Sequence, residues 1–237
     1  MDRQSMLAAL RARIGRLERA GLRHAQDPVP LAEEIDAQLP GSGLARAGLH
    51  EVLAADTGAA TGFCAMVLGR TGGTVLWIGP EPDAWPPGLA RFGLSPAQLV
   101  FVRAPRGADA LWAMEEALRC PAVSGALLMT DGVDLTAARR LQLAAEAGGG
   151  LGLLLRPDTE EDAPSATLTR WRITGLASTG GAPHELGDPR WQLDLLRCRG
   201  GTPATWRTTW RTTLDRLDLD QGGEAAEAKP RAARRRR

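Results

Sequence analysis

The chain of 237 residues is long enough to bury a substantial core, and its 43% apolar and 24% charged residues are ordinary for a soluble globular protein. Its formal net charge is +1, but residues 222–237 hold six basic and two acidic side chains, hence +4, which leaves −3 on the rest of the chain. A folded surface that binds nucleic acid usually carries a basic excess, so the composition argues against a nucleic-acid-binding body.

The sequence also argues against membrane insertion, export and metal binding. No apolar run approaches the roughly 18 residues that span a bilayer. The polar, helix-like start does not resemble a signal peptide, so we expect a cytoplasmic protein. Structural zinc sites need cysteines and histidines at short spacing, whereas the three of each are widely separated here. We therefore expect no metal and no other cofactor, and three buried free thiols: Cys64, Cys120 and Cys198.

Residues 1–26 are predicted to form an N-terminal helical arm. Apolar residues recur there at spacings of three and four with arginines between them, which indicates an amphipathic helix with a narrow apolar stripe. A proline-rich linker at 27–30 separates the arm from the rest of the chain. Two placements stay open: the arm packs on its own domain, or it lies on another chain. The stripe consists of Leu7, Leu10, Ile14 and Leu17.

From residue 48 to residue 157 the chain alternates strand-like and helix-like segments. Continuous apolar runs, typical of strands buried on both faces, are separated by segments with helical periodicity. Short connections between them predict an α/β fold with a mostly parallel sheet flanked by helices. The expected strands are 48–54, 74–79, 99–102, 125–131 and 151–155, and the expected helices are 62–70, 86–92, 108–120 and 135–147.

Beyond residue 157 the pattern changes to period two. Three further strands, joined by glycine- and proline-rich turns, predict an antiparallel C-terminal extension of the sheet. Residues 220–237 are rich in glycine, alanine and arginine, and we expect them to form a disordered basic tail. The folded domain is therefore placed at residues 31–219. The three strands are expected at 167–176, 190–199 and 205–214.

The stretch AADTGAAT stands between a strand and a helix, where a nucleotide-binding loop would read G-x-x-x-x-G-K-[ST]. Ala54, Ala59 and Ala60 replace the two glycines and the lysine, and only Thr61 matches. Lys229, in the tail, is the only lysine of the sequence. The missing ammonium is worth about 4 kcal/mol against a charge about 4 Å away at an effective dielectric near 20. The pattern therefore predicts a loop without nucleotide chemistry.

The order of elements resembles the ATPase core of the RecA family over residues 38–213. PGSGLARAGLHEVLAADTGAAT resembles the lead-in strand and P-loop of that family, and LLRCR resembles a strand whose basic-x-basic pair reaches a neighbouring subunit's nucleotide. Arg197 and Arg199 form that pair here. Glu81 and Asp131 stand where the family has its catalytic glutamate and its magnesium-associated aspartate. The resemblance implies a RecA-like core with a degenerate P-loop and a vestigial nucleotide site: Ala54, Ala59, Ala60, Thr61, Glu81 and Asp131.

A closer resemblance is to the ImuA family, the RecA-like accessory proteins of bacterial damage-inducible mutagenesis cassettes. It is carried by LPGSGLARAGLHEV, ADALWAMEEALRC, DLTAARRLQLAAEAGG, TRWRI and RWQLDLLRCRGGTPATW. The resemblance implies a role in SOS-type translesion synthesis together with ImuB, which is a polymerase-like protein, and an error-prone DNA polymerase. RecA is a further implied partner.

Each retained residue of the vestigial site also has a purely structural interpretation. Thr61 would be the N-cap of the following helix, and Glu81 and Asp131 would be polar residues at strand ends. We expect no ATP hydrolysis, so the protein is not expected to be an enzyme. Two alternatives stay open: a weak RecA-type ATPase, and a cell-division inhibitor related to SulA, which shares a degenerate RecA-like core.

Direct contact with DNA is not expected from the folded body. The RecA family guides DNA along two loops, but here Asp131 leads almost directly into the next helix. The acidic run DTEED replaces the second loop and would repel phosphate. The basic tail could hold DNA or an acidic partner weakly and in a salt-dependent way, or it could be functionally silent.

The candidate partner-binding residues lie on the arm and on the strand that carries Arg197 and Arg199. In a RecA-like geometry such elements meet an adjacent protomer, which could be RecA or a second copy of this chain, so self-association stays open. The alternative for either arginine alone is an exposed strand face.

Five of the seven tryptophans are most simply explained as core residues, whereas Trp85 falls in a proline-rich turn. Trp77, Trp112 and Trp171 fall inside apolar elements. Trp206 and Trp210 share one face of a strand, so core packing is favoured for them as well, although exposed tryptophan beside arginine is also typical of interfaces.

Overall fold

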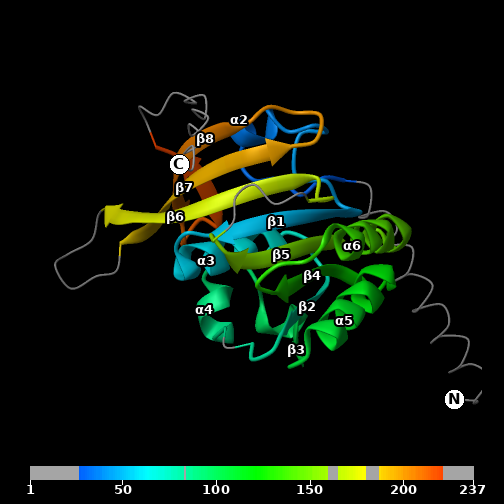
Figure 1. Ribbon diagram of the computed structural model, residues 1–237. Helices are drawn as coiled ribbons and strands as arrows, with labels where there is room; N and C mark the ends of the chain where they lie inside the picture. Colours follow the sequence, from blue (N-terminus) through cyan, green and yellow to red (C-terminus); the bar gives the residue numbers. More distant parts are fainter. Residues whose placement is uncertain (1–26, 83, 160–164, 180–186, 221–237) are drawn as a thin grey trace, which may run out of the picture.

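A nine-stranded mixed sheet forms the framework of the protein (Figure 1). The computed structural model describes residues 27–82, 84–159, 165–179 and 187–220. Outside them lie the predicted tail beyond its first residue and the predicted arm with Leu7, Leu10, Ile14 and Leu17. The strands are β1 (Gly48–Ala54), β2 (Thr74–Gly79), β3 (Leu99–Arg103), β4 (Val123–Met129), β5 (Leu151–Pro157), β6 (Thr169–Thr179), β7 (Asp188–Cys198), β8 (Ala204–Arg211) and β9 (Arg216–Leu219).

The strands follow the order β3-β2-β4-β5-β1-β6-β7-β8-β9. The pairs from β3 through to β6 are parallel, and those from β6 to β9 are antiparallel. The predicted α/β fold, with a mostly parallel core and an antiparallel C-terminal extension, is therefore confirmed. The first strand of the extension, β6, joins β1 in parallel, so the change of direction comes between β6 and β7.

Helices cover both faces of the parallel part of the sheet. The helical segments are α2 (Glu33–Asp36), α3 (Thr57–Gly69), α4 (Pro86–Ala90), the 3-10 turn η1 (Pro96–Gln98), α5 (Gly107–Arg119) and α6 (Leu135–Gly148). The core on one face forms around α3, whereas α5 and α6 pack side by side on the other face (Figure 1). The short elements α2 and β9 have no counterpart among the expected ones.

The ends of α6 illustrate how the sequence sets helix boundaries. The carboxylate of Asp134 accepts a hydrogen bond from the backbone N–H of Ala137 at 2.7 Å, which makes Asp134 the N-cap. Gly149 follows the last helical residue with φ +81°, a left-handed conformation that favours glycine. As a result, α6 begins six residues after β4 ends, and the connection between them is short.

An aromatic cluster fills the core on the α3 side of the sheet. Phe63 lies 5.8 Å from Trp171 between ring centroids, and Trp171 lies 6.0 Å from Trp206. Phe92 contacts Trp191 at 5.7 Å and Trp210 at 6.3 Å. The predicted burial of Trp171, Trp206 and Trp210 is confirmed, as is that of Trp77. Such tilted ring pairs stabilise the core beyond the apolar area that they bury.

Two predicted core residues lie at the surface instead. Trp112 is 65% exposed, because the buried positions of α5 follow a stripe through Ala110, Met114 and Leu118, and residue 112 falls on the opposite side of the helix. Cys120 is exposed because it follows the last residue of α5. The other two thiols are buried as predicted.

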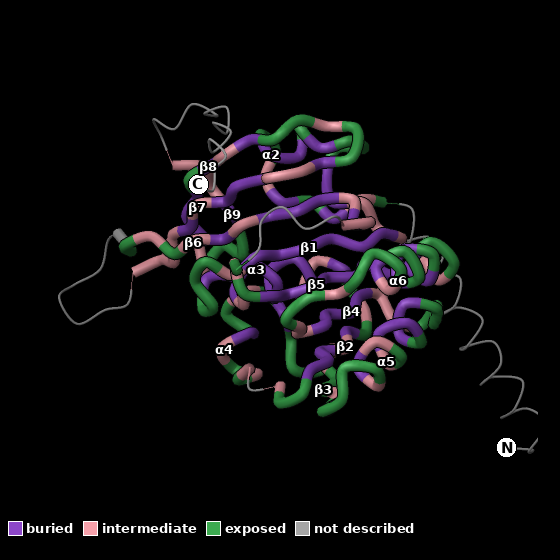
Figure 2. The backbone as a smooth tube through the Cα atoms, in the orientation of Figure 1, coloured by how far each residue is buried: buried purple, intermediate pink, exposed green. Residues whose placement is uncertain are grey.

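The most deeply buried residues lie on the strands in the middle of the sheet. Figure 2 shows that the central strands β1 and β5 are buried along nearly their whole length, while the outer faces of α5 and α6 are exposed. Among the described residues, no helix combines the length and the apolar character that crossing a bilayer requires.

Candidate functional site

The AADTGAAT stretch joins β1 to α3 as a capped helix start and not as an open loop. α3 begins at Thr57, and Asp56 is its N-cap. The Asp56 carboxylate Oδ1 accepts a hydrogen bond from the backbone N–H of Ala59 at 2.8 Å. The backbone N–H of Ala60 donates to the carbonyl oxygen of Asp56 at 2.9 Å. Most of the stretch is therefore the first turn of a helix.

This geometry corrects two expectations for the junction. The helix was expected from Gly62 with Thr61 as its N-cap, but Thr61 is the fifth residue of α3. Asp56 takes the capping role because aspartate is among the best N-cap residues and its carboxylate reaches the N–H three positions on. None of the residues of the stretch has a positive φ, so the backbone does not need glycine at Ala54 or Ala59.

The junction is a poor site for a phosphate. A helix N-terminus attracts anions because its first N–H groups have no partner within the helix. At α3 the Asp56 carboxylate already accepts one of these hydrogen bonds and places a negative charge beside the others. Ala60, at the position of the P-loop lysine, is fully buried and Ala59 is 8% exposed, so neither side chain points toward solvent. A phosphate would meet a carboxylate and no cation from these residues.

The other two residues of the vestigial site lie at the ends of neighbouring strands. Glu81 follows β2, and its Oε1 lies 3.5 Å from Nη2 of Arg103, at the end of β3, in a well-exposed ion pair. Asp131 follows β4 and lines a hollow of about 300 Å³ with Thr130 and Gly132. β5 separates β4 from β1 in the sheet. In the part of the chain that the structure describes, no three acidic, histidine or cysteine side chains are grouped to hold a metal ion.

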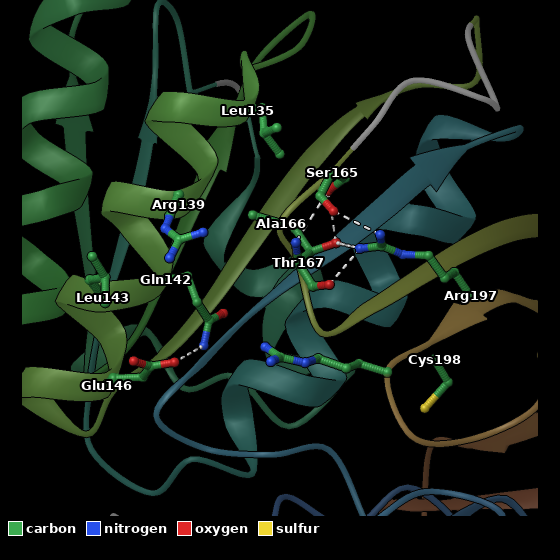
Figure 3. A pocket seen from close by; sticks show the side chains of 11 residues that line it. Leu135, Arg139, Gln142, Leu143, Glu146, Ser165, Ala166, Thr167, Arg197 and Cys198 are labelled. Carbon is green, nitrogen blue, oxygen red and sulfur yellow. Dashed lines mark hydrogen bonds between the residues drawn. The ribbon is translucent and has the colours of Figure 1, made fainter.

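Arg197 and Arg199 both line a second hollow, of about 680 Å³, but they differ in what they contact. Arg197 Nη1 donates to the carbonyl oxygen of Ser165 at 2.7 Å, and its Nη2 donates to that of Thr167 at 2.5 Å. Figure 3 shows its guanidinium directed at this segment. Burial, followed by the neighbouring guanidinium of Arg170, lowers the pKa of Arg197, yet an arginine stays protonated in a protein.

Arg199, by contrast, is exposed, and no hydrogen bond or ion pair joins its side chain to another residue within the described parts of the chain. Arg199 lies in the turn after β7 and not on a strand face, as the alternative had it, whereas Arg197 is partly buried on β7 and holds the segment before β6 in place. The structure brings the two predicted residues to one hollow with separate roles.

The opposite wall of this hollow is formed by α6. Leu135, Arg139 and Leu143 lie on it at spacings of four residues, and hence on one side of the helix. Gln142 and Glu146 complete this wall (Figure 3), joined by a hydrogen bond of 2.9 Å from Gln142 Nε2 to Glu146 Oε1. Gln142 Oε1 also accepts from the backbone N–H of Leu49 at 2.8 Å, which ties α6 to the start of β1.

A buried charge cluster beside this hollow was not predicted from the sequence. Glu51 on β1 accepts hydrogen bonds from Nε of Arg156 on β5 and from Nε of Arg170 on β6, both at 2.6 Å, and all three residues are nearly inaccessible. Burial raises the pKa of Glu51, but the hydrogen bonds from the two guanidiniums outweigh it, so the net pKa is lowered. A glutamate inside the apolar strand GLHEVLA was the only signal for this cluster.

Comparison with protein-family models gives no match. Among curated proteins, the chain is similar to Protein ImuA of Caulobacter vibrioides, in the strains NA1000 / CB15N and ATCC 19089 / CIP 103742 / CB 15. In each case the identity is 40% over 192 residues, which covers 73% of this chain and 78% of the relative.

Proposed function

The chain belongs to the ImuA family, and from that premise we propose that it is a non-catalytic accessory protein of damage-induced mutagenesis. In this role it links an ImuB-like, polymerase-like protein and an error-prone DNA polymerase to damaged DNA or to RecA. Its RecA-like core serves as an interaction module in the cytoplasm and uses no nucleotide.

The observation that carries the non-catalytic role is the capped junction between β1 and α3. The Asp56 carboxylate occupies the helix N-terminus that a triphosphate would need, and the buried Ala60 provides no cation. Repulsion between this carboxylate and a phosphate adds to the loss of roughly 4 kcal/mol from the missing lysine. Glu81, which would orient the attacking water in an ATPase, is instead paired with Arg103.

The short connection between β4 and α6 supports an indirect relation to DNA. Only residues 130–134 separate the two elements, so no extended loop follows Asp131. The net charge of −3 outside residues 222–237 also disfavours a phosphate-binding surface on the folded body. Contact with damaged DNA is therefore assigned to the partners.

The catalytic part of the proposal is tested by measuring phosphate release from Mg-ATP, with and without single-stranded DNA. We expect the wild-type chain and the matched variant Asp131→Asn to give the same background. Millimolar Mg-ATP should also leave the melting temperature unchanged, whereas a ligand at a hundred times its Kd stabilises a protein by about 2.7 kcal/mol. Hydrolysis that is lost in Asp131→Asn would contradict the proposal and favour the ATPase alternative.

The accessory part is tested by affinity capture of the full chain from cells with damaged DNA. We expect the ImuB-like protein and the error-prone polymerase to be retained. Retention of a filament-forming division protein in their place would contradict the proposal and favour the SulA-like alternative.

A further inference from the structure

The hollow between α6 and the end of β7 has the size and the composition of a peptide-binding site. Its volume of about 680 Å³ lies within the range of roughly 300–1,000 Å³ typical of ligand pockets. One wall is the outer side of α6, and the other is formed by residues 165–167 and 197–199 (Figure 3). The first wall is a helix, whereas the second combines the end of β7, the turn that follows it and residues 165–167 of the connection before β6.

The hollow carries a local excess of positive charge. Arg139, Arg197 and Arg199 line it, against the single carboxylate of Glu146, so the balance is +3 − 1 = +2. Within the described residues, neither Arg139 nor Arg199 has a side-chain hydrogen bond or ion pair, whereas Glu146 is engaged by Gln142. The chain outside residues 222–237 has a net charge of −3, so the charge of this hollow is opposite in sign to that of the body as a whole.

Two exposed leucines flank Arg139 on the α6 wall of the hollow. Leu135 is 53% exposed and Leu143 is 55% exposed, on the same side of α6 as Arg139. The leucines are eight positions apart, which places them about 12 Å from each other along the helix axis at 1.5 Å per residue. Exposed apolar groups beside polar ones mark interaction surfaces, and a partner helix of two to three turns would cover both leucines.

The site is held in shape before any ligand binds. Arg197 fixes the backbone of residues 165–167 through hydrogen bonds to two carbonyl oxygens, and Gln142 ties α6 to the start of β1. A preorganised surface loses less entropy on binding than a flexible one. The backbone segments on either side of the hollow are thus tied to the sheet, and α6 carries both leucines and Arg139.

We propose that this hollow binds a short acidic, amphipathic segment of a partner protein, with its apolar residues on Leu135 and Leu143 and its carboxylates on Arg139 and Arg199. Nucleic acid fits less well, because the exposed leucines would contribute little to a contact with a sugar-phosphate backbone. The inference rests on the proposed accessory function and identifies one docking site and the chemistry of its ligand.

The test is fluorescence anisotropy of the full chain with labelled synthetic peptides. The first peptide has leucines every three or four positions among aspartates and glutamates; the second replaces the acidic residues by lysine and arginine; the third replaces the leucines by serine. Labelled oligo(dT) is the nucleic-acid probe. We expect the first peptide to bind at least about tenfold more tightly than the other three probes.

Variants of exposed side chains assign the binding to the hollow without disturbing the core. R139E/R199E and L135S/L143S should each weaken the first peptide by about tenfold, as the loss of exposed ion pairs or of apolar burial predicts. The matched control R91E/R207E reverses two exposed arginines elsewhere and should bind as the wild type does. Unchanged melting temperatures exclude unfolding as the cause.

Several outcomes overturn the inference. These are no preference for the first peptide, equal loss in the control variant, or tighter binding of oligo(dT) with the same arginine dependence. Binding that appears only after E160Q/E161Q/D162N would also overturn it, because the chain's own acidic run and not a partner would then be the ligand. If R139E/R199E instead retains the polymerase components in affinity capture, the docking site is wrong while the accessory function stands.

Discussion

Glu51 is the residue whose removal should destabilise this protein most directly. Its carboxylate lies between two buried guanidiniums, those of Arg156 and Arg170. Removal of one partner from a buried ion cluster leaves uncompensated charge and typically costs 3–5 kcal/mol. We therefore expect Glu51→Gln to lower the free energy of unfolding by about 3 kcal/mol or more, measured by urea denaturation.

Glu146 provides a matched control for this prediction. It is an exposed glutamate whose one described hydrogen bond comes from Gln142. Glu146→Gln should change the unfolding free energy by less than about 1 kcal/mol. Equal effects of the two substitutions would contradict the assignment of the Glu51 cluster as a structural centre.

His50 makes stability depend on pH in a defined window. Burial lowers the pKa of this imidazole to about 4, and its hydrogen bond to Ala45 only partly opposes that effect. The carbonyl oxygen of Ala45 can only accept, so Nε2 donates to it at 2.8 Å, while Nδ1 lies 2.8 Å from the hydroxyl of Thr169. The folded state therefore holds the neutral ring.

The unfolded chain takes up a proton at His50 below about pH 6.5, whereas the folded protein does so only near pH 4. The unfolded state thus binds more protons in this interval, and stability falls as the pH falls. At 1.36 kcal/mol per pH unit, the loss between pH 6.5 and pH 5 is about 2 kcal/mol. Melting curves at pH 7.5 and 5.0 should show this loss in the wild type and a smaller one in His50→Gln; equal slopes would contradict the assignment.

At the scale of elements, the start of α3 depends on one side chain. Loss of an N-cap aspartate typically costs 0.5–2 kcal/mol, so Asp56→Ala should lower the unfolding free energy by about 1 kcal/mol. Asp56→Asn keeps an accepting oxygen and should be nearly neutral. The matched substitution at α6, Asp134→Ala, should behave as Asp56→Ala does, because its cap has the same geometry.

Urea denaturation of the three variants measures these differences. If Asp56→Ala leaves the midpoint unchanged while Asp134→Ala lowers it, Asp56 is not the effective cap of α3. Neither Asp56 substitution should confer binding of Mg-ATP, because neither provides a cation.

Sequence reasoning succeeded for elements with strong local signals. TVLWIG and LGLLL are continuous apolar runs, and both are strands with a neighbour on each side in the sheet. The sequence did not predict β9, because RLDL has only four residues and two of them are charged. The start of α3 was predicted too late, because the P-loop pattern favoured Thr61 as the N-cap although Asp56 is the better capping residue. Sequence reasoning could not find the Glu51 cluster, whose partners are 105 and 119 residues away along the chain.

At the scale of the whole molecule, charge is divided between a negative body and a positive tail. The excess of +4 on residues 222–237 should account for any retention of this protein on single-stranded DNA at low salt. We expect deletion of these residues to abolish that retention, and retention by the full chain to fall steeply as salt rises. Filter binding over a salt series measures both. Unchanged retention after the deletion would place the contact on the body instead.

Only part of the candidate site could be predicted from the sequence, because its walls come from distant parts of the chain. The family resemblance pointed to Arg197 and Arg199 as candidates. It did not predict that the Arg197 guanidinium donates hydrogen bonds to the carbonyl oxygens of Ser165 and Thr167. Those contacts join positions about thirty residues apart, and only the folded sheet brings them together. The wall formed by α6 was likewise not predicted, because leucines at this spacing are typical of any amphipathic helix.

The buried position of Ala60 has an evolutionary consequence. A lysine restored there by one mutation would put its ammonium group among apolar side chains, at a cost of several kcal/mol, comparable to the entire stability of many domains. A lysine at this position is therefore not accessible by a single substitution without a large loss of stability.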